Sequence, residues 1–240
     1  MSRRPRAGQE SPQRSRSASW KTWLVWSLVI VVVGCAALGG AAWWAIGKTP
    51  AFYATALNRD ASHAAKAGDE LERRALELRN SARRAGSWSF VVTEEEANGW
   101  LIAKLGQEFP QALPSQFQEP RVAVDSQGLQ IGVQYREGDW KTVVSAQLDL
   151  YLTDQPNEIA VEFKALRAGW LPLPLERVIE PLQAASRREG VPIRWTQAKS
   201  GPVAIWTVPD RPRDFGGRRV VVERVEKRAG QIVISGRSEK

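Results

Sequence analysis

The chain of 240 residues has very few of the side chains on which most enzyme and metal chemistry depends. It contains one cysteine, Cys35, one histidine, His63, and one methionine. A single cysteine excludes an intrachain disulfide, so a folded part must be stabilised by an ordinary hydrophobic core. The sequence also lacks a His/Cys/Asp ligand cluster, a Gly-x-Ser-x-Gly motif, a P-loop and a dinucleotide-binding motif. We therefore predict no catalytic residues, no metal and no cofactor, in a protein that is not an enzyme.

Charged residues are absent from one long apolar run. From Thr22 to Gly47 no residue is charged, and most positions are Val, Leu, Ile, Ala, Gly or Trp. An α-helix rises about 1.5 Å per residue, so roughly 20 apolar residues cross a bilayer core. We predict a transmembrane helix over residues 20–47, because the apolar core of a cleaved signal peptide is usually only about 7–15 residues. Tryptophans, which favour the membrane–water interface, mark both ends of the run: Trp20, Trp23 and Trp26 at the first, Trp43 and Trp44 at the second.

Positive charge is concentrated before this run. Residues 1–48 hold seven basic residues and one acidic residue, which is +6 of the net charge of +8 of the whole chain. Segments rich in Lys and Arg stay in the cytoplasm, so we predict a disordered basic cytoplasmic tail, residues 1–19, and residues 48–240 outside the cell membrane. The outer part carries only about +2 and offers no basic face for nucleic acid. We expect the lipid bilayer as a partner, and no nucleic acid.

Cys35 allows a second interpretation of the run. Val32-Val33-Gly34-Cys35 is similar to a bacterial lipobox, in which the cysteine is lipidated and becomes the new N-terminus. The chain of a lipoprotein normally turns polar soon after that cysteine, whereas here eleven uncharged residues follow Cys35, through Ile46. We therefore favour an unmodified cysteine inside a spanning helix.

Residues 51–85, inside a juxtamembrane segment of residues 48–86, have the pattern of one long helix. Small and apolar residues recur at spacings of three and four, close to a heptad stripe: Tyr53, Leu57, Ala61, Ala64, Gly68, Leu71, Ala75, Leu78 and Ala82. Because most of them are Ala or Gly, the stripe permits a close approach to another surface but buries little apolar area. Two placements stay open: a stalk that holds the next domain off the membrane, or a helix packed on the sheet that follows.

A short strand and a capped helix are predicted next. Residues 88–92 form the strand, and Thr93 with Glu96 three residues later is the pattern of a capping box. The helix should run from Glu94 towards Phe109. Acidic residues in the first turn also suit the helix dipole, so the glutamates at 94–96 need no catalytic role.

From Pro120 onward apolar and polar residues alternate with the period of a strand. Four strands with short turns between them, over residues 120–165, predict an antiparallel meander with one apolar face and one wet face. A helix over residues 175–188 follows, and then four more strands: 193–197, 203–208, 219–225 and 231–236. The fold class predicted for residues 87–240 is therefore α+β, an extracytoplasmic domain whose antiparallel sheet packs with two amphipathic helices.

Two short motifs in this domain resemble those of a known family. Glu96-Ala97-Asn98 opens a helix after an early strand, and Gly169-Trp170-Leu171-Pro172-Leu173-Pro174 precedes a later helix. Together with the N-terminal anchor, residues 88–240 resemble the YpmS-like group of bacterial membrane-anchored proteins. The resemblance implies an extracytoplasmic α+β domain with an apolar groove between helix and sheet, and carries over no catalytic residue. The long helix 51–85 and the Arg-rich tail depart from that group.

The candidate groove lies at the second of these motifs. Exposed, Trp170 would line a groove or touch the bilayer, as aromatic residues often do at interfaces. We predict a groove for an apolar ligand, a lipid or an envelope protein beneath the helix 175–188, lined by Trp170, Leu171, Leu173 and Leu182. The predicted function is that of a single-pass, membrane-anchored, non-catalytic binding or scaffold module of the bacterial cell envelope. The alternative is an envelope hydrolase with a carboxylate pair, for which Asp149 and Glu162 on facing strands are candidates.

Overall fold

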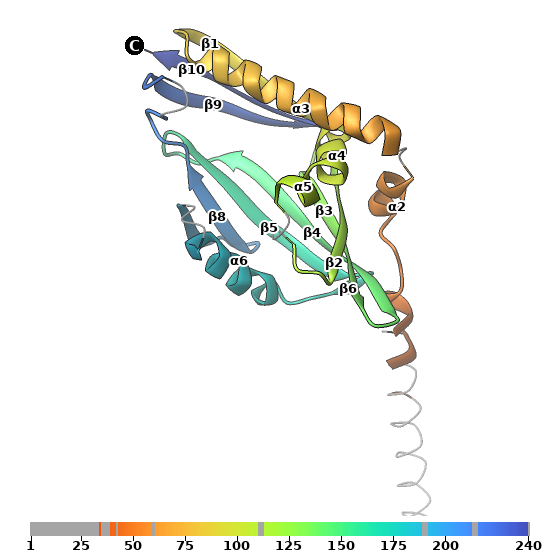
Figure 1. Ribbon diagram of the computed structural model, residues 1–240. Coiled ribbons are helices and arrows are strands. Elements are labelled where there is room, and N and C mark those ends of the chain that lie inside the picture. The colour runs from red at the N-terminus through yellow and green to blue at the C-terminus, as the bar shows by residue number, and fades with distance from the viewer. Residues whose placement is uncertain are drawn as a thin grey trace, which may run out of the picture. The chain divides into compact units, whose positions relative to one another are not determined.

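The computed structural model describes residues 34, 39–41, 43–58, 61–109, 113–188, 192–212 and 216–239. The chain divides into two compact units, Met1–Trp43 and Trp44–Lys240. The predicted basic tail and most of the predicted transmembrane helix, with Trp20, Trp23, Trp26 and Cys35, lie outside the described residues. Within the described part, no helix combines the length and the apolar character needed to cross a bilayer. The elements below all belong to the second unit (Figure 1).

A seven-stranded antiparallel sheet contains the predicted meander. Its strand order is β2-β3-β4-β5-β8-β7, and the short β6 pairs with β5 beside this path. The four strands of the meander are confirmed, each close to the predicted bounds: β2 (Phe117–Val124), β3 (Leu129–Glu137), β4 (Trp140–Leu152) and β5 (Glu158–Ala168). The other members are β6 (Leu171–Pro172), β7 (Ile193–Gln197) and β8 (Pro202–Thr207).

A second, three-stranded sheet has the order β1-β10-β9. Its strands are β1 (Gly86–Thr93), β9 (Arg219–Arg228) and β10 (Gln231–Glu239). The strand that follows the N-terminal helices therefore pairs with the last strand of the chain, with Gly86 opposite Ser238 and Thr93 opposite Gln231. The mixture of helices and antiparallel strands agrees with the predicted α+β class.

The stretch predicted as one long helix contains two, α2 (Ala51–Leu57) and α3 (Ala61–Ala82). The first ends at Leu57 with Asn58 as its C-cap, a residue whose side chain competes with helical hydrogen bonds and favours helix ends. Helix α3 lies along the three-stranded sheet (Figure 1). Ala64 and Ala82 of its Ala/Gly stripe are buried, so α3 is packed on the fold rather than a free stalk.

Helix α3 also packs against α4 (Glu94–Ala103), which a short α5 (Leu105–Glu108) follows. The helices approach so closely that a Cβ at Gly99 would lie 2.5 Å from the carbonyl oxygen of Ala64. The predicted capping box is confirmed. The Thr93 hydroxyl accepts from the Glu96 amide at 3.2 Å, and the Glu96 carboxylate accepts from the Thr93 amide at 3.0 Å.

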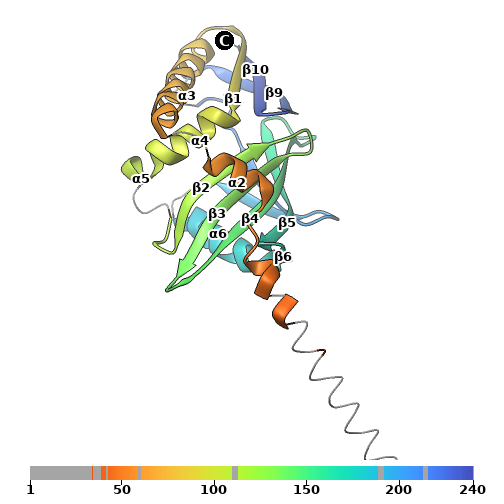
Figure 2. The same cartoon turned by 90° about the vertical axis from the view of Figure 1, so that its right-hand side faces the viewer.

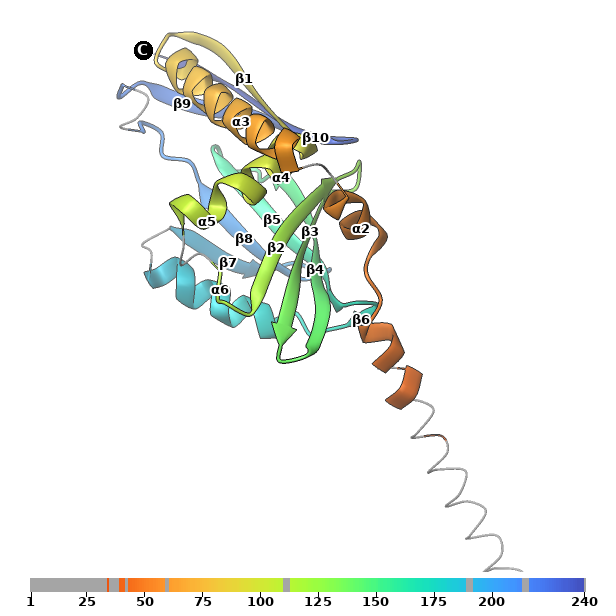
Figure 3. The same ribbon diagram turned by 45° about the vertical axis from the view of Figure 1, so that its right-hand side comes forward.

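Helices cover both faces of the large sheet. On one face, Ile179 of α6 (Glu176–Arg188) packs with the buried Leu148 and Phe163. On the other face, Phe52 and Tyr53 of α2 lie over Gly132 of β3. Figures 2 and 3 show α2 and α6 on opposite sides of the strands β3 and β4. The sheet was predicted to pack with two amphipathic helices, and α6, within the predicted range 175–188, is confirmed as one of them.

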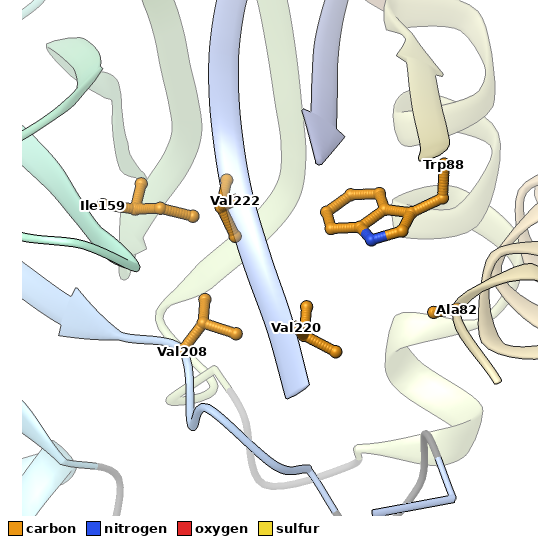
Figure 4. Packing of buried hydrophobic residues seen from close by; sticks show 6 residues of the cluster. All are labelled: Ala82, Trp88, Ile159, Val208, Val220 and Val222. Carbon is orange, nitrogen blue, oxygen red and sulfur yellow. The ribbon is translucent and has the colours of Figure 1, made fainter. Parts of the chain in front are cut away.

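An apolar cluster joins the two sheets (Figure 4). It consists of Ala82 from α3, Trp88 from β1, Ile159 from β5, Val208, and Val220 and Val222 from β9. Figure 4 shows Val222 between Ile159 and the indole of Trp88, with Ala82 beyond Val220. Burying these side chains from five segments contributes about 25 cal/mol per Å² of apolar surface removed from water, so the cluster ties the small sheet to the large one.

Candidate functional site

Trp170 stands at the tip of a tight turn between β5 and β6. Strand β6 folds back on β5, with Ala168 opposite Leu171, so that only Gly169 and Trp170 connect them. Gly169 has φ +58, in the left-handed region that glycine adopts most easily. Its N–H donates to the carbonyl oxygen of Val143 at 2.8 Å, which holds the turn against β4. Trp170 is 56% exposed, which is the condition under which the sequence placed it in a groove or at the bilayer.

The last residues of the predicted membrane run are bound to this turn and to β4. The Trp170 N–H donates to the carbonyl oxygen of Ala45 at 2.9 Å, and the Thr142 hydroxyl donates to that of Ile46 at 2.6 Å. A side chain at position 169 would collide with this segment, because a Cβ on Gly169 would lie 2.4 Å from both of these carbonyl oxygens. The glycine of the second motif is therefore needed for the close approach of residues 45–46.

Two tryptophans and a lysine meet at the same place. The rings of Trp44 and Trp170 pack edge to face, with centroids 5.5 Å apart. The Lys48 ammonium lies 4.1 Å from the centroid of Trp44 and 5.9 Å from that of Trp170, within the range of cation–π attraction. Trp44 is 57% exposed, so both indoles present apolar surface to the solvent.

A cleft of about 540 Å³ opens beside this turn, on the face of the large sheet that carries α2. Aromatic and polar side chains line it: Phe52 and Trp170, together with Gln130, Ser145, Gln147 and Arg167. We call it the Trp170 cleft. Arg167 is exposed, and no hydrogen bond or ion pair joins its side chain to another described residue. The cleft thus offers one cation and several amide and hydroxyl groups behind an aromatic rim.

The four predicted groove residues do not share this cleft. Only Trp170 lines it, whereas Leu171 and Leu173 are half-buried and Leu182 on α6 is 39% exposed. The cleft also lies on the α2 face, not beneath α6, because Ile179 of α6 and Leu175 just before this helix pack on the other face of the sheet. Sequence reasoning missed Gln130, Gln147 and Arg167, which look like ordinary wet-face positions of alternating strands.

The carboxylates of the hydrolase alternative do face each other. Asp149 of β4 is opposite Glu162 of β5. Lys164 donates to Glu162 at 2.7 Å and lies 3.8 Å from Asp149, which also pairs with Lys227 of β9. Hydrogen bonds from Lys164 and from the Ser200 hydroxyl hold the pKa of Glu162 below its usual value, and Glu162 in turn raises the pKa of Lys164. A general acid needs a raised carboxyl pKa, so the cluster instead has the chemistry of ion pairs that join strands.

Among the described residues, no group of three or more His, Cys, Asp or Glu side chains is placed to hold a metal ion. The glutamates at 94–96 serve the helix start: Glu96 closes the capping box and pairs with Arg74 at 3.0 Å, and Glu94 accepts from the Val124 amide at 3.0 Å. Asn98 of the first motif is buried and bonded to Val122 of β2. The residues of that motif therefore act in packing.

Comparison with known proteins adds no relative to these observations. No protein-family model matches the chain. No curated protein matches it either.

Proposed function

We propose that this chain is a single-pass, membrane-anchored protein of the bacterial cell envelope, with its α+β unit outside the membrane as a non-catalytic module that binds membrane lipid. The observation that carries this proposal is the position of the Trp170 cleft. The end of the predicted transmembrane run is bound to the turn that forms one wall of the cleft, because the Trp170 N–H donates to the carbonyl oxygen of Ala45. This contact supports a ligand that belongs to the membrane.

The groups around the cleft suit the headgroup region of a lipid. Exposed indoles such as Trp44 and Trp170 favour the membrane–water interface. Lys48 and Arg167 supply positive charge beside them, and cations near the surface are attracted to anionic phosphates. Gln130, Gln147 and Ser145 add hydrogen-bonding groups that fit the polar part of a headgroup. We include in this proposal that the chain is a member of the YpmS-like group.

Native mass spectrometry of the full chain, purified in mild detergent from bacterial membranes, tests the proposal. We expect a bound lipid, and an occupancy at least threefold lower in Trp170→Ala and Arg167→Gln. Trp206→Ala is the matched control, because Trp206 is also exposed, at 43%, but does not line the cleft. Equal lipid on all variants would contradict a lipid site in the cleft, since the predicted transmembrane helix alone would then hold it. A bound protein in place of a lipid would favour a scaffold role.

A further inference from the structure

A second cavity lies between the helices α4 and α5 and the edge strand β2. Its volume is about 460 Å³, within the usual range for small-molecule sites. Most of its walls are apolar: Leu101, Ile102, Leu105, Phe109 and Phe117 line it, together with Arg121. None of the residues around it lines the Trp170 cleft, so the two sites are separate.

Arg121 is the unusual member of this wall. Its side chain is almost fully buried, with the residue only 7% exposed. Its Nη1 donates to the carbonyl oxygen of Pro120 at 2.9 Å, while its buried Nε has no hydrogen-bond partner among the described residues. Arginine side chains are very rarely buried without a paired acid.

No acidic group in the described part of the chain neutralises this guanidinium. Glu119 lines the same cavity, but it is exposed and forms no ion pair with Arg121. Tyr53 lies close by, and its hydroxyl donates to the carbonyl oxygen of Glu119 at 2.8 Å. Burial, and then the charge of Glu119, raise the pKa of Tyr53 to about 12, so the phenol stays uncharged at neutral pH.

A buried, unpaired charge is costly, and an anion that enters the cavity would offset that cost. A guanidinium binds a carboxylate or phosphate through two parallel N–H donors, which adds geometric selectivity. We propose that this cavity binds an amphiphile with one anionic head group and one hydrocarbon chain. The head group pairs with Arg121, and the chain lies against the leucines and phenylalanines of α4, α5 and β2.

Photo-crosslinking of the full chain in phosphatidylethanolamine/phosphatidylglycerol nanodiscs tests this site. The probe is palmitic acid with a diazirine in its chain, and its methyl ester is the uncharged control probe. We expect the acid, and not the ester, to label peptides that contain residues 101–109 or 117–121. Competition with unlabelled palmitate and with lysophosphatidylglycerol then distinguishes a carboxylate head group from a phosphate one.

Two variants act on the site independently. Arg121→Gln removes the charge, and labelling of these peptides should fall at least fivefold. Gly106→Leu fills the cavity without touching the charge, because a Cβ at Gly106 meets no atom within 4 Å, and it should lower labelling equally. Arg177→Gln, at an exposed position of α6 that lines neither cavity, is the matched control and should label as the parent does.

Thermal unfolding shows whether each variant is folded. If Arg121→Gln does not fold, the labelling of Gly106→Leu alone tests the proposal. Equal labelling by acid and ester, labelling of the folded variants within twofold of the parent, or no label on these peptides would each overturn the proposal. None of these outcomes depends on lipid binding in the Trp170 cleft.

Discussion

Two buried asparagines connect elements of this fold, each through both the donor and the acceptor of its side-chain amide. Asn98 donates to the carbonyl oxygen of Val122 at 2.7 Å and accepts from the Val122 N–H at 2.9 Å. A side chain of α4 thus provides hydrogen-bond partners for the backbone at the edge of β2. Asn157 donates to the carbonyl oxygen of Val220 at 2.7 Å and accepts from the N–H of Val222 at 2.8 Å. Each side-chain amide forms the hydrogen bonds that a neighbouring strand would otherwise form. The buried backbone N–H and C=O groups that it meets are therefore not left unpaired.

Replacing Asn98 by alanine should therefore be strongly destabilising. The change leaves the N–H and the C=O of the buried Val122 without partners, at roughly 1–3 kcal/mol for each group. We expect the free energy of unfolding to fall by about 2–4 kcal/mol, measured by urea unfolding of the full chain in detergent. Asn80→Ala on the exposed side of α3 is the control and should change it by at most about 0.5 kcal/mol. Similar losses in both variants would contradict the role assigned to the Asn98 amide.

Gly169→Ala should release the last residues of the predicted membrane run from the turn before β6. The new Cβ would collide with the carbonyl oxygens of Ala45 and Ile46, so we expect faster hydrogen exchange at the Trp170 amide. Gly138→Ala is a close control. Gly138 has the same φ of +58, but a Cβ there meets no atom within 4 Å. Equal exchange rates at Trp170 in the two variants would contradict the role assigned to the close approach at Gly169.

Interactions between near neighbours in the sequence were predictable, and those between distant residues were not. The capping box of Thr93 and Glu96 joins residues three apart, so its pattern is visible in the chain itself. Asn98 bonds to a residue 24 positions away, and Gly169 contacts residue 45. Nothing local distinguishes these two positions from a surface amide or an ordinary turn glycine, because their partners are set only by the tertiary fold.

At the scale of elements, the strands were predictable and the sheets were not. Alternation of apolar and polar residues defines a strand but not its neighbour, so the pairing of β1 with β10 across most of the domain had no local signal. The meander β2–β5 was predictable because its turns are short and sequential strands usually pair. The Ala/Gly stripe of α3 permitted close packing but did not exclude a stalk, and its partners in the structure are α4 and β1.

The ion pairs between β4, β5 and β9 should make the fold sensitive to acid. Because the folded pKa of Glu162 lies below its usual value of 4.5, its contribution to stability is present above that value and is lost as the pH falls through the folded pKa. The raised pKa of Lys164 works in the opposite direction, and its contribution is lost only at pH above 10.5. The pairing is therefore complete at neutral pH.

We expect Glu162→Gln to be less stable than the parent at pH 7 and to lose less stability on acidification from about pH 6 to about pH 3. Melting temperatures of the full chain over this range measure the difference. Glu180→Gln, at an exposed position of α6, is the control and should follow the parent curve. A parent and a Glu162→Gln variant with parallel acid curves would contradict this assignment.

At the scale of the whole molecule, the candidate site was only partly predictable. The position of Trp170 between a glycine and a proline-rich run made it a candidate interface residue, and the structure adds that it is exposed. The cleft beside it is formed by α2 and by the wet face of β3–β5, which come together only in the tertiary structure. Leu182 was grouped with Trp170 because the groove was predicted beneath the helix 175–188, although α6 packs on the other face of the sheet.

The lipobox alternative for Cys35 gives a prediction about the anchor. If a spanning helix and not a lipid holds the chain, Cys35→Ser should leave its attachment to membranes unchanged after extraction with carbonate. The intact mass of the parent should equal that of the unmodified polypeptide. A mass increased by acyl groups, or release of Cys35→Ser into the soluble fraction, would instead indicate a lipoprotein.

The orientation of the chain follows from the asymmetry of its charges. Basic residues precede the apolar run, and the unit that follows has little net charge, so the N-terminus should be cytoplasmic. In a Cys35→Ser background, Ala229→Cys in the exposed turn between β9 and β10 should react with a membrane-impermeant maleimide on intact spheroplasts. Ser17→Cys in the basic tail should react only after lysis. Labelling of Ser17→Cys alone before lysis would show the opposite orientation, with both proposed ligand sites on the cytoplasmic side. Labelling of both cysteine variants before lysis would contradict the predicted spanning helix.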